Sequence, residues 1–224
     1  MITDINQLDF SKQYTYADYL TWKFKERVEL IRGWIMKMAA PSIKHQQFSR
    51  RLQRQMDRYF GEGPCQFLSA PVDVRLPDYR YPANVGDDQI YDTVQPDLLV
   101  VCDPAKLDAK GCLGAPDWII EILSPGNSKK EMQHKHALYE WAGVREYWIV
   151  QPEHLTTLVF DLVDGAYRMR KAYAHDDDVP CGVFPELSID MRLVFPDDQK
   201  EWNDVVAEEE AAYRATYRST PQAF

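Results

Sequence analysis

The chain has 224 residues, 45% of them hydrophobic, and a formal net charge of -9. This length supports one substantial core and does not require a second, so we expect residues 1–224 to form a single domain. The acidic balance excludes nucleic-acid binding through bulk positive charge, so any such contact must be local. No segment approaches the ~18 apolar residues of a membrane helix and no signal sequence is evident, so we expect a cytoplasmic protein.

Charge and cysteine are distributed unevenly along the chain. The basic residues of one segment are Lys44, Arg50, Arg51, Arg54 and Arg58. The tail, residues 196–224, is acidic and predicted to be helical. The cysteines at positions 65, 102, 112 and 181 have no CxxC spacing. They indicate reduced thiols, with neither a structural zinc site nor a disulfide framework.

The N-terminal part of the chain predicts a short helix, a hairpin and a longer helix. Residues 15–25 have a capping threonine and a helical spacing of aromatic residues and leucine. Residues 28–31 and 34–38 are strand-like runs joined by an Arg-Gly turn that uses the freedom of glycine at positive φ. Ser42 caps the longer helix, whose apolar residues recur every three or four positions as far as Gly61.

The middle of the chain predicts strands that belong to a buried sheet. Short strands are expected at 65–69 and 72–76, followed by a loop rich in Asp, Pro and Gly at 77–93. Nearly unbroken apolar runs at 98–102 and 118–123, bridged by 103–116, predict central strands covered on both faces.

After these strands the chain predicts a strand-helix-strand unit and a second hairpin. A helix is expected at about 128–142, ended by Gly143, and a strand at 146–150, an order that favours a right-handed crossover. Runs at 156–162 and 167–173, separated by an Asp-Gly pair, predict the hairpin.

Two carboxylates interrupt the apolar runs. Asp97 follows Pro96 at the start of the first run, and Glu121 lies inside the second. A buried carboxylate loses several kcal/mol of hydration unless it is paired, protonated or bound to a metal. We interpret Asp97 and Glu121 as cation ligands that face each other. The alternatives are a turn residue at Asp97 and a buried ion pair with an arginine at Glu121.

The order of elements and several short motifs resemble the Uma-type endonuclease family of the PD-(D/E)xK nuclease superfamily. The motifs lie at residues 29–33, 40–42 with His45, 95–98, 121–125, Lys135 with Tyr139, and 143–150. The resemblance covers about residues 14–195. It implies a restriction-endonuclease-like α/β fold, in which helices flank a central mixed β-sheet, with an N-terminal helix and hairpin and a C-terminal helix.

The resemblance also implies an active site, with one departure from the superfamily pattern. That pattern reads Glu-x-Lys, but position 123 is leucine. In the family a lysine on the following helix takes its place, and Lys135 is the corresponding residue. Lys135 also lies at helical spacing from Met132 and Tyr139 on an apolar stripe, which predicts that it points inward. The alternative is an ordinary surface pair with Glu131.

The family resemblance assigns roles to these residues. Mg²⁺ or Mn²⁺ would be held by Asp97, Glu121 and the carbonyl of Ile122, and Lys135 would orient or activate the attacking water. Glu29 would be a further carboxylate near the metal, although strand alternation also allows it to face solvent. Tyr139 is interpreted as a packing residue.

The resemblance implies an endonuclease that acts on nucleic acid, taken to be DNA, and is compatible with a homodimer. Candidate nucleic-acid contacts are His45, Arg50, Arg54, Lys129 and Lys130, for which helix capping or simple solvation is the alternative. One rival function is a nuclease fold that has lost turnover and serves as a binding or regulatory module, for which Leu123 is the best argument. Another is a two-carboxylate hydrolase that acts on sugars.

Overall fold

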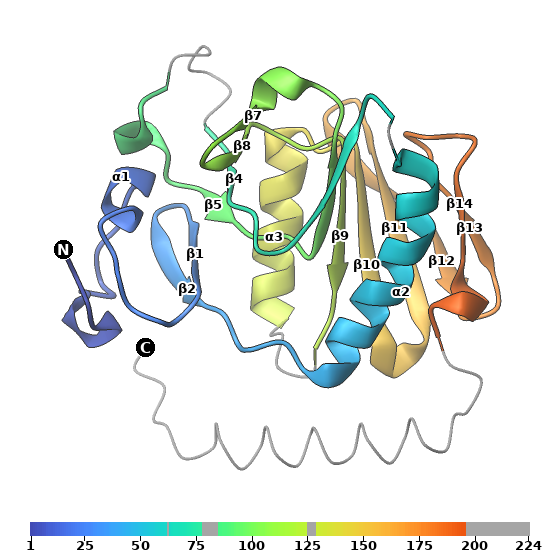
Figure 1. The fold of residues 1–224 in the computed structure, drawn as a ribbon, viewed down its shortest axis with the longest axis horizontal. Coiled ribbons are helices and arrows are strands. Elements are labelled where there is room, and N and C mark those ends of the chain that lie inside the picture. Colours follow the sequence, from blue (N-terminus) through green and yellow to red (C-terminus); the bar gives the residue numbers. More distant parts are fainter. Residues whose placement is uncertain (62, 78–84, 125–128, 196–224) are drawn as a thin grey trace.

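The computed structural model describes residues 1–61, 63–77, 85–124 and 129–195, apart from the side chains of residues 129–131. Two six-stranded sheets and the helices between and around them form the fold (Figure 1). The large sheet has the order β12 (Ala166–Ala174), β11 (Thr156–Val163), β10 (Glu146–Gln151), β9 (Trp118–Ile122), β6 (Leu98–Val101), β3 (Gln66–Ser69). The small sheet has the order β2 (Trp34–Lys37), β1 (Val28–Ile31), β5 (Thr93–Val94), β4 (Val74–Arg75), β8 (Gly111–Leu113), β7 (Leu107–Asp108).

The remaining elements are short, except for two helices. The α-helices are α1 (Tyr16–Tyr19), α2 (Ile43–Phe60) and α3 (Lys129–Ala142). Strands β13 (Asp178–Pro180) and β14 (Ser188–Asp190) form a separate hairpin. The 3-10 helices are η1 (Ile5–Gln7), η2 (Asp87–Gln89), η3 (Pro104–Lys106), η4 (Pro152–His154) and η5 (Met191–Leu193). Within the described residues, no helix is both long enough and apolar enough to cross a membrane.

The large sheet is mixed, as predicted. Strands β9 and β10 are parallel and are connected through α3, whereas their outer neighbours β6 and β11 pair antiparallel with them. The α/β class with a mixed central sheet is therefore confirmed. The small sheet was not predicted as a separate layer. Its strand β4 lies within the strand expected at 72–76, but β5 and β7 have two residues each, too few for a pattern to be recognised in the sequence.

The two long helices cover opposite faces of the large sheet (Figure 1). Phe48, Leu52 and Met56 of α2 pack on the face that carries Ile120. Leu138 and Tyr139 of α3 pack on the other face, with Ile119, Tyr147 and the core of the small sheet. Because side chains alternate along a strand, Glu121 lies on the same side of β9 as Ile119, the side covered by α3.

The structure corrects several predicted boundaries. The helix expected at 15–25 ends after Tyr19: Thr15 and Asp18 form a capping box at its start, and Trp22 instead forms a bridge with Ile2. The bridging segment 103–116 contains the strands β7 and β8. The predicted loop at 77–93 contains η2 and the start of β5, while residues 78–84 lie outside the described part. The predicted tail helix also lies outside the described residues.

The expectation that all thiols are reduced is wrong for one pair. Cys65 and Cys102 form a disulfide. The residues next to them, Gln66 and Val101, are partners in the antiparallel β3–β6 ladder, so the two cysteines face each other across its end. Their separation of 37 positions concealed this pairing in the sequence. Cys112 and Cys181 are free and buried.

Two hairpin turns with nearly equal φ angles provide a matched stability test. Arg32 and Gly33 have φ of 52° and 78°, and Asp164 and Gly165 have φ of 54° and 78°. A Cβ at Gly33 would lie 2.9 Å from Cβ of Gln13, whereas one at Gly165 would meet nothing within 4 Å. Both alanine variants incur the backbone penalty of about 1–2 kcal/mol for left-handed φ. We expect Gly33→Ala to lower the free energy of unfolding further than Gly165→Ala in urea titrations, and equal losses would contradict this contact.

Candidate active site

Asp97 lies immediately before β6, where two elements hold its carboxylate. Its Oδ2 accepts a hydrogen bond of 2.8 Å from the backbone N–H of Ile122 in β9. The same oxygen is 3.1 Å from Nε2 of His45, in the first turn of α2. The side chain of Asp97 keeps 18% of its surface exposed. Asp97 is therefore fixed beside the end of β9 while remaining accessible.

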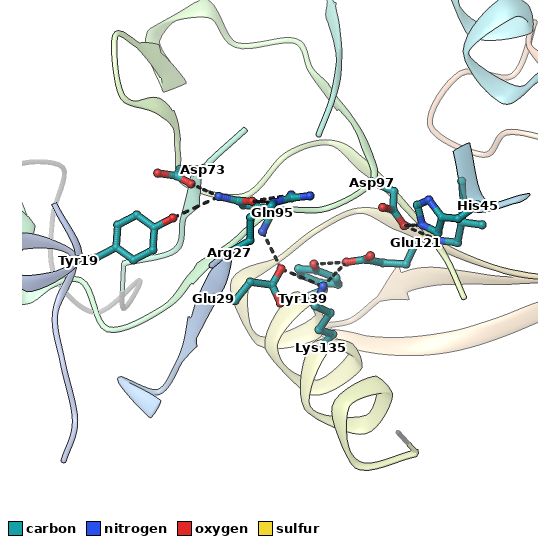
Figure 2. Close-up of polar contacts among 11 residues, drawn as sticks. Tyr19, Arg27, Glu29, His45, Asp73, Gln95, Asp97, Glu121, Lys135 and Tyr139 are labelled. Carbon is teal, nitrogen blue, oxygen red and sulfur yellow. Dashed lines mark hydrogen bonds and ion pairs between the residues drawn. The ribbon is translucent and has the colours of Figure 1, made fainter. Parts of the chain in front are cut away.

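Glu121 is enclosed by side chains of α3 (Figure 2). Its Oε1 is 3.0 Å from Nζ of Lys135 and accepts a hydrogen bond of 2.6 Å from the hydroxyl of Tyr139. Lys135 and Tyr139 are four residues apart, so they share one face of the helix. The alternative predicted a buried ion pair between Glu121 and an arginine. The structure shows a buried ion pair, but its partner is Lys135.

Lys135 also contacts a carboxylate of the small sheet. Its Nζ is 3.0 Å from Oε1 of Glu29 in β1, and the same oxygen accepts a hydrogen bond of 2.8 Å from the backbone N–H of Gln95. Glu29 is only 1% exposed, so the solvent-facing alternative for it is wrong. Lys135 points inward as predicted, and its ammonium lies between Glu29 and Glu121 (Figure 2).

The burial of these charges shifts their pKa values. Burial raises the pKa of Glu121; the charge of Lys135 opposes this shift, while those of Asp97 and Glu29 add to it. Burial alone would lower the pKa of Lys135, but Glu121 and Glu29 outweigh it and hold that pKa well above its ordinary value. Burial likewise raises the pKa of Tyr139. The lysine is therefore a cationic donor, and the tyrosine is a neutral one.

His45 is a buried member of the site. Burial lowers its pKa, but the hydrogen bond and the charge of Asp97 raise it, and the net shift is upward. Its Nδ1 is buried and has no hydrogen-bond partner among the described residues. His45 therefore lies against Asp97 rather than on an open nucleic-acid face.

The other candidate nucleic-acid contacts have no described contact with this cluster, although they belong to the same two helices. Arg50 and Arg54 are exposed on α2. Lys129 and Lys130 begin α3, and their side chains lie outside the described part. Position 123, where the superfamily pattern has lysine, packs its leucine against the core on the α3 side.

The donor chemistry of the site fits a hard divalent cation. Asp97 and Glu121 offer carboxylate oxygens from adjacent strands, and such oxygens together with water are the ligands that Mg²⁺ prefers. Among the described residues, no group of three or more His, Cys, Asp or Glu side chains is arranged to hold a metal ion. A cation here would therefore need backbone carbonyl or water ligands beside the two carboxylates.

Two residues of the site were not assigned to it from the sequence. Tyr139 was interpreted as a packing residue; it is buried as expected, but its hydroxyl binds Glu121. Its position four residues after Lys135 is a signal that could have revealed this role. Gln95 holds Glu29 through its backbone, and nothing in the sequence indicates such a contact.

Comparison with known proteins identifies the family. The model of the Uma2 family, described as "Putative restriction endonuclease", matches residues 16–192. A crystal structure from Anabaena variabilis, described as "a putative nuclease belonging to DUF820", is similar with a TM-score of 0.62 and 21% identity, over 84% of this chain and 98% of that chain. The comparison with curated proteins found no match. The family match covers most of the chain and the fold is shared with that structure, so this protein belongs to the Uma2 family of restriction-endonuclease-like proteins.

Proposed function

We propose that this protein is a Mg²⁺- or Mn²⁺-dependent endonuclease that hydrolyses phosphodiester bonds in DNA. The observation that carries the proposal is the convergence of Glu121, Lys135 and Glu29 in one buried cluster, with Asp97 beside it at the start of the neighbouring strand β6. A protein under selection for stability alone would gain by replacing such buried charges with apolar side chains.

The carboxylates of Asp97 and Glu121 are the proposed metal ligands. Asp97 is held through Oδ2, and the described contacts of the Glu121 carboxylate both involve Oε1, so each group has a second oxygen for a cation. The carbonyl of Ile122 remains the proposed third ligand. When bound, the cation would polarise a phosphoryl oxygen and supply positive charge where negative charge develops.

Lys135 is proposed to orient the attacking water and to stabilise the phosphoryl oxygens. Its raised pKa keeps the ammonium protonated, so it acts as a hydrogen-bond donor and not as a base. In the reaction, a bond from the water oxygen to phosphorus forms while one phosphate ester bond breaks; the proton that the water loses passes to solvent, and the leaving oxygen takes up a proton from solvent. Glu29, already paired with this ammonium, is proposed to be a positioning residue that holds Lys135 in place.

Substrate contacts outside the site are proposed for the exposed arginines of α2. Arg50 and Arg54 are solvent-accessible, and their planar guanidinium groups suit bidentate contact with a phosphate backbone. His45 lies in the first turn of the same helix and touches Asp97, so α2 extends from the proposed metal ligand to these arginines. Lys129 and Lys130 are further proposed contacts.

The decisive experiment is a cleavage assay with purified protein. Plasmid, linear duplex, single-stranded DNA and RNA are incubated with Mg²⁺, with Mn²⁺ and with EDTA, beside the Asp97→Asn variant. We expect cleavage that requires the cation and falls by about a hundredfold or more in the variant. Cleavage that survives both EDTA and Asp97→Asn would contradict the proposal. Specific Mn²⁺ uptake without cleavage of any substrate would favour a module that has lost turnover.

A further inference from the structure

A second polar cluster lies on the opposite side of Glu29 from Lys135 and is centred on Gln95 (Figure 2). Gln95 is 8% exposed and stands two residues before Asp97. Its Oε1 accepts hydrogen bonds of 3.1 Å and 2.6 Å from Nε and Nη2 of Arg27. Its Nε2 donates to Oδ1 of Asp73 at 2.8 Å and to the hydroxyl of Tyr19 at 3.2 Å.

These partners leave the Gln95 amide a single orientation. Arg27 can only donate, so it must face the amide oxygen, and the oxygen Oδ1 of Asp73 accepts, so it faces the amide nitrogen. Both hydrogen atoms of Nε2 and both acceptor positions of Oε1 are then used. The positive and negative charges at its two ends also align the dipole of the amide.

The backbone of the same residue reaches the proposed active site. The N–H of Gln95 donates to Oε1 of Glu29, the oxygen that also contacts Nζ of Lys135. Fixing the side chain of Gln95 therefore fixes the donor that sets the position of the Glu29 carboxylate. The contacts with Arg27 and Asp73 extend this restraint to the start of β1 and to the residue before β4.

We propose that Gln95 is a positioning residue, which holds Glu29 and through it the ammonium of Lys135. The inference rests on the nuclease function proposed above, because positioning matters only if Lys135 takes part in the reaction. Gln95 itself touches neither of the proposed metal ligands through a described contact. Its effect should therefore appear in turnover and not in metal affinity.

The first test separates turnover from binding in the variant Gln95→Met, which keeps the length of the side chain and removes its four hydrogen bonds. We expect kcat to fall about tenfold, because a small misplacement of a catalytic group costs at least that much. The KM and the dissociation constant for Mn²⁺ should stay within about twofold of wild type, a range that corresponds to less than ~0.5 kcal/mol. A loss of Mn²⁺ affinity equal to the loss of kcat would overturn the proposal.

Two further variants guard against a general loss of structure. Gln95→Glu can keep the contact with Arg27, so it should fold, but it places a carboxylate against Asp73 and should therefore still lose kcat. Gln66→Met is the matched control, since Gln66 is exposed and pairs with Val101 at the far end of β6 from Asp97. The control should keep the kcat of wild type. An equal loss of kcat in the control would overturn the proposal.

A double-mutant cycle with Glu29→Met tests whether Gln95 acts through Glu29. If it does, adding Gln95→Met to Glu29→Met lowers kcat no further, whereas independent effects multiply. The same cycle, measured as urea midpoints without metal, does not depend on catalysis. If wild type cleaves nothing, the nuclease function fails, yet non-additive midpoints would still support the link from Gln95 to Glu29. Additive midpoints would overturn that link.

Discussion

Replacing Lys135 with methionine is expected to lower the free energy of unfolding by about 3–5 kcal/mol, since removal of one partner leaves uncompensated buried charge. Glu29 and Glu121 would lose the ammonium that lies 3.0 Å from each of them. Both carboxylates are at least nine-tenths buried, so water cannot replace it. Cleavage of DNA should be abolished in the same variant. Urea unfolding and the plasmid assay measure the two effects.

The stability loss in Lys135→Met should depend on pH in a defined direction. The pKa of Glu121 is already raised above its ordinary 4.5 by burial, and losing the ammonium removes the charge that opposes this shift. A carboxyl whose folded pKa exceeds its unfolded pKa stabilises the fold below the unfolded value, and this stability is lost as the pH rises through the folded value. The pKa of Glu121 is already about 7 in wild type, so below that pH both proteins lose this stability in parallel, and the deficit of the variant should grow as the pH rises above about 7.

A matched surface lysine provides the control for this prediction. Lys171 pairs with Asp177, but its side chain is 56% exposed. Lys171→Met should change the free energy of unfolding by less than about 1 kcal/mol, because exposed pairs contribute little. Equal losses in Lys171→Met and Lys135→Met would show that the buried position of Lys135 has no special importance.

The variant Glu121→Gln is expected to lower the rate of metal-dependent cleavage about a thousandfold, since metal ions contribute several kcal/mol to such reactions. The amide keeps the shape of the side chain and an oxygen that can accept from Tyr139, so the fold should persist. It removes the charge that would attract a divalent cation. Calorimetric titration with Mn²⁺ should show at least tenfold weaker binding, about 1.4 kcal/mol.

The control for Glu121→Gln is the same substitution at an exposed position. Glu153 lies in η4 on the surface, and Glu153→Gln should leave both the cleavage rate and Mn²⁺ binding unchanged. If Glu121→Gln retained the Mn²⁺ affinity of wild type, Glu121 would have to be withdrawn as a ligand. The ion pair between Glu121 and Lys135 would then serve only to stabilise the fold.

The sequence predicts the parts of the fold whose patterns are long. The helix α2 is bounded by Ser42 and Gly61 as expected, and its apolar stripe is the face that packs on the sheet. Strands β9 and β10 follow from their apolar runs. By contrast, β5 and β7 have two residues each, so no periodicity can mark them, and the small sheet arises from tertiary pairing.

The candidate site was predictable where a residue conflicts with its surroundings. Glu121 inside an apolar strand and Lys135 on an apolar helix stripe both signal a buried charge, and the structure pairs them. Glu29 gave a weaker signal, because a four-residue strand with one charged side chain can be exposed on one face or buried on both, and only the structure shows that all four residues are buried. The contact of Gln95 with Glu29 is made by a backbone N–H, which every residue except proline possesses, so this contact leaves no trace in sequence.

The ammonium of Lys135 joins two layers of the molecule, because Glu29 belongs to the small sheet and Glu121 to the large one. Neither layer alone contains both acidic partners. A chain whose N-terminal hairpin has detached keeps Asp97 and Glu121 but loses one of the two anchors of the lysine. In the proposed nuclease, a molecule whose two sheets have not assembled would therefore lack one of the two carboxylates that hold Lys135 in place.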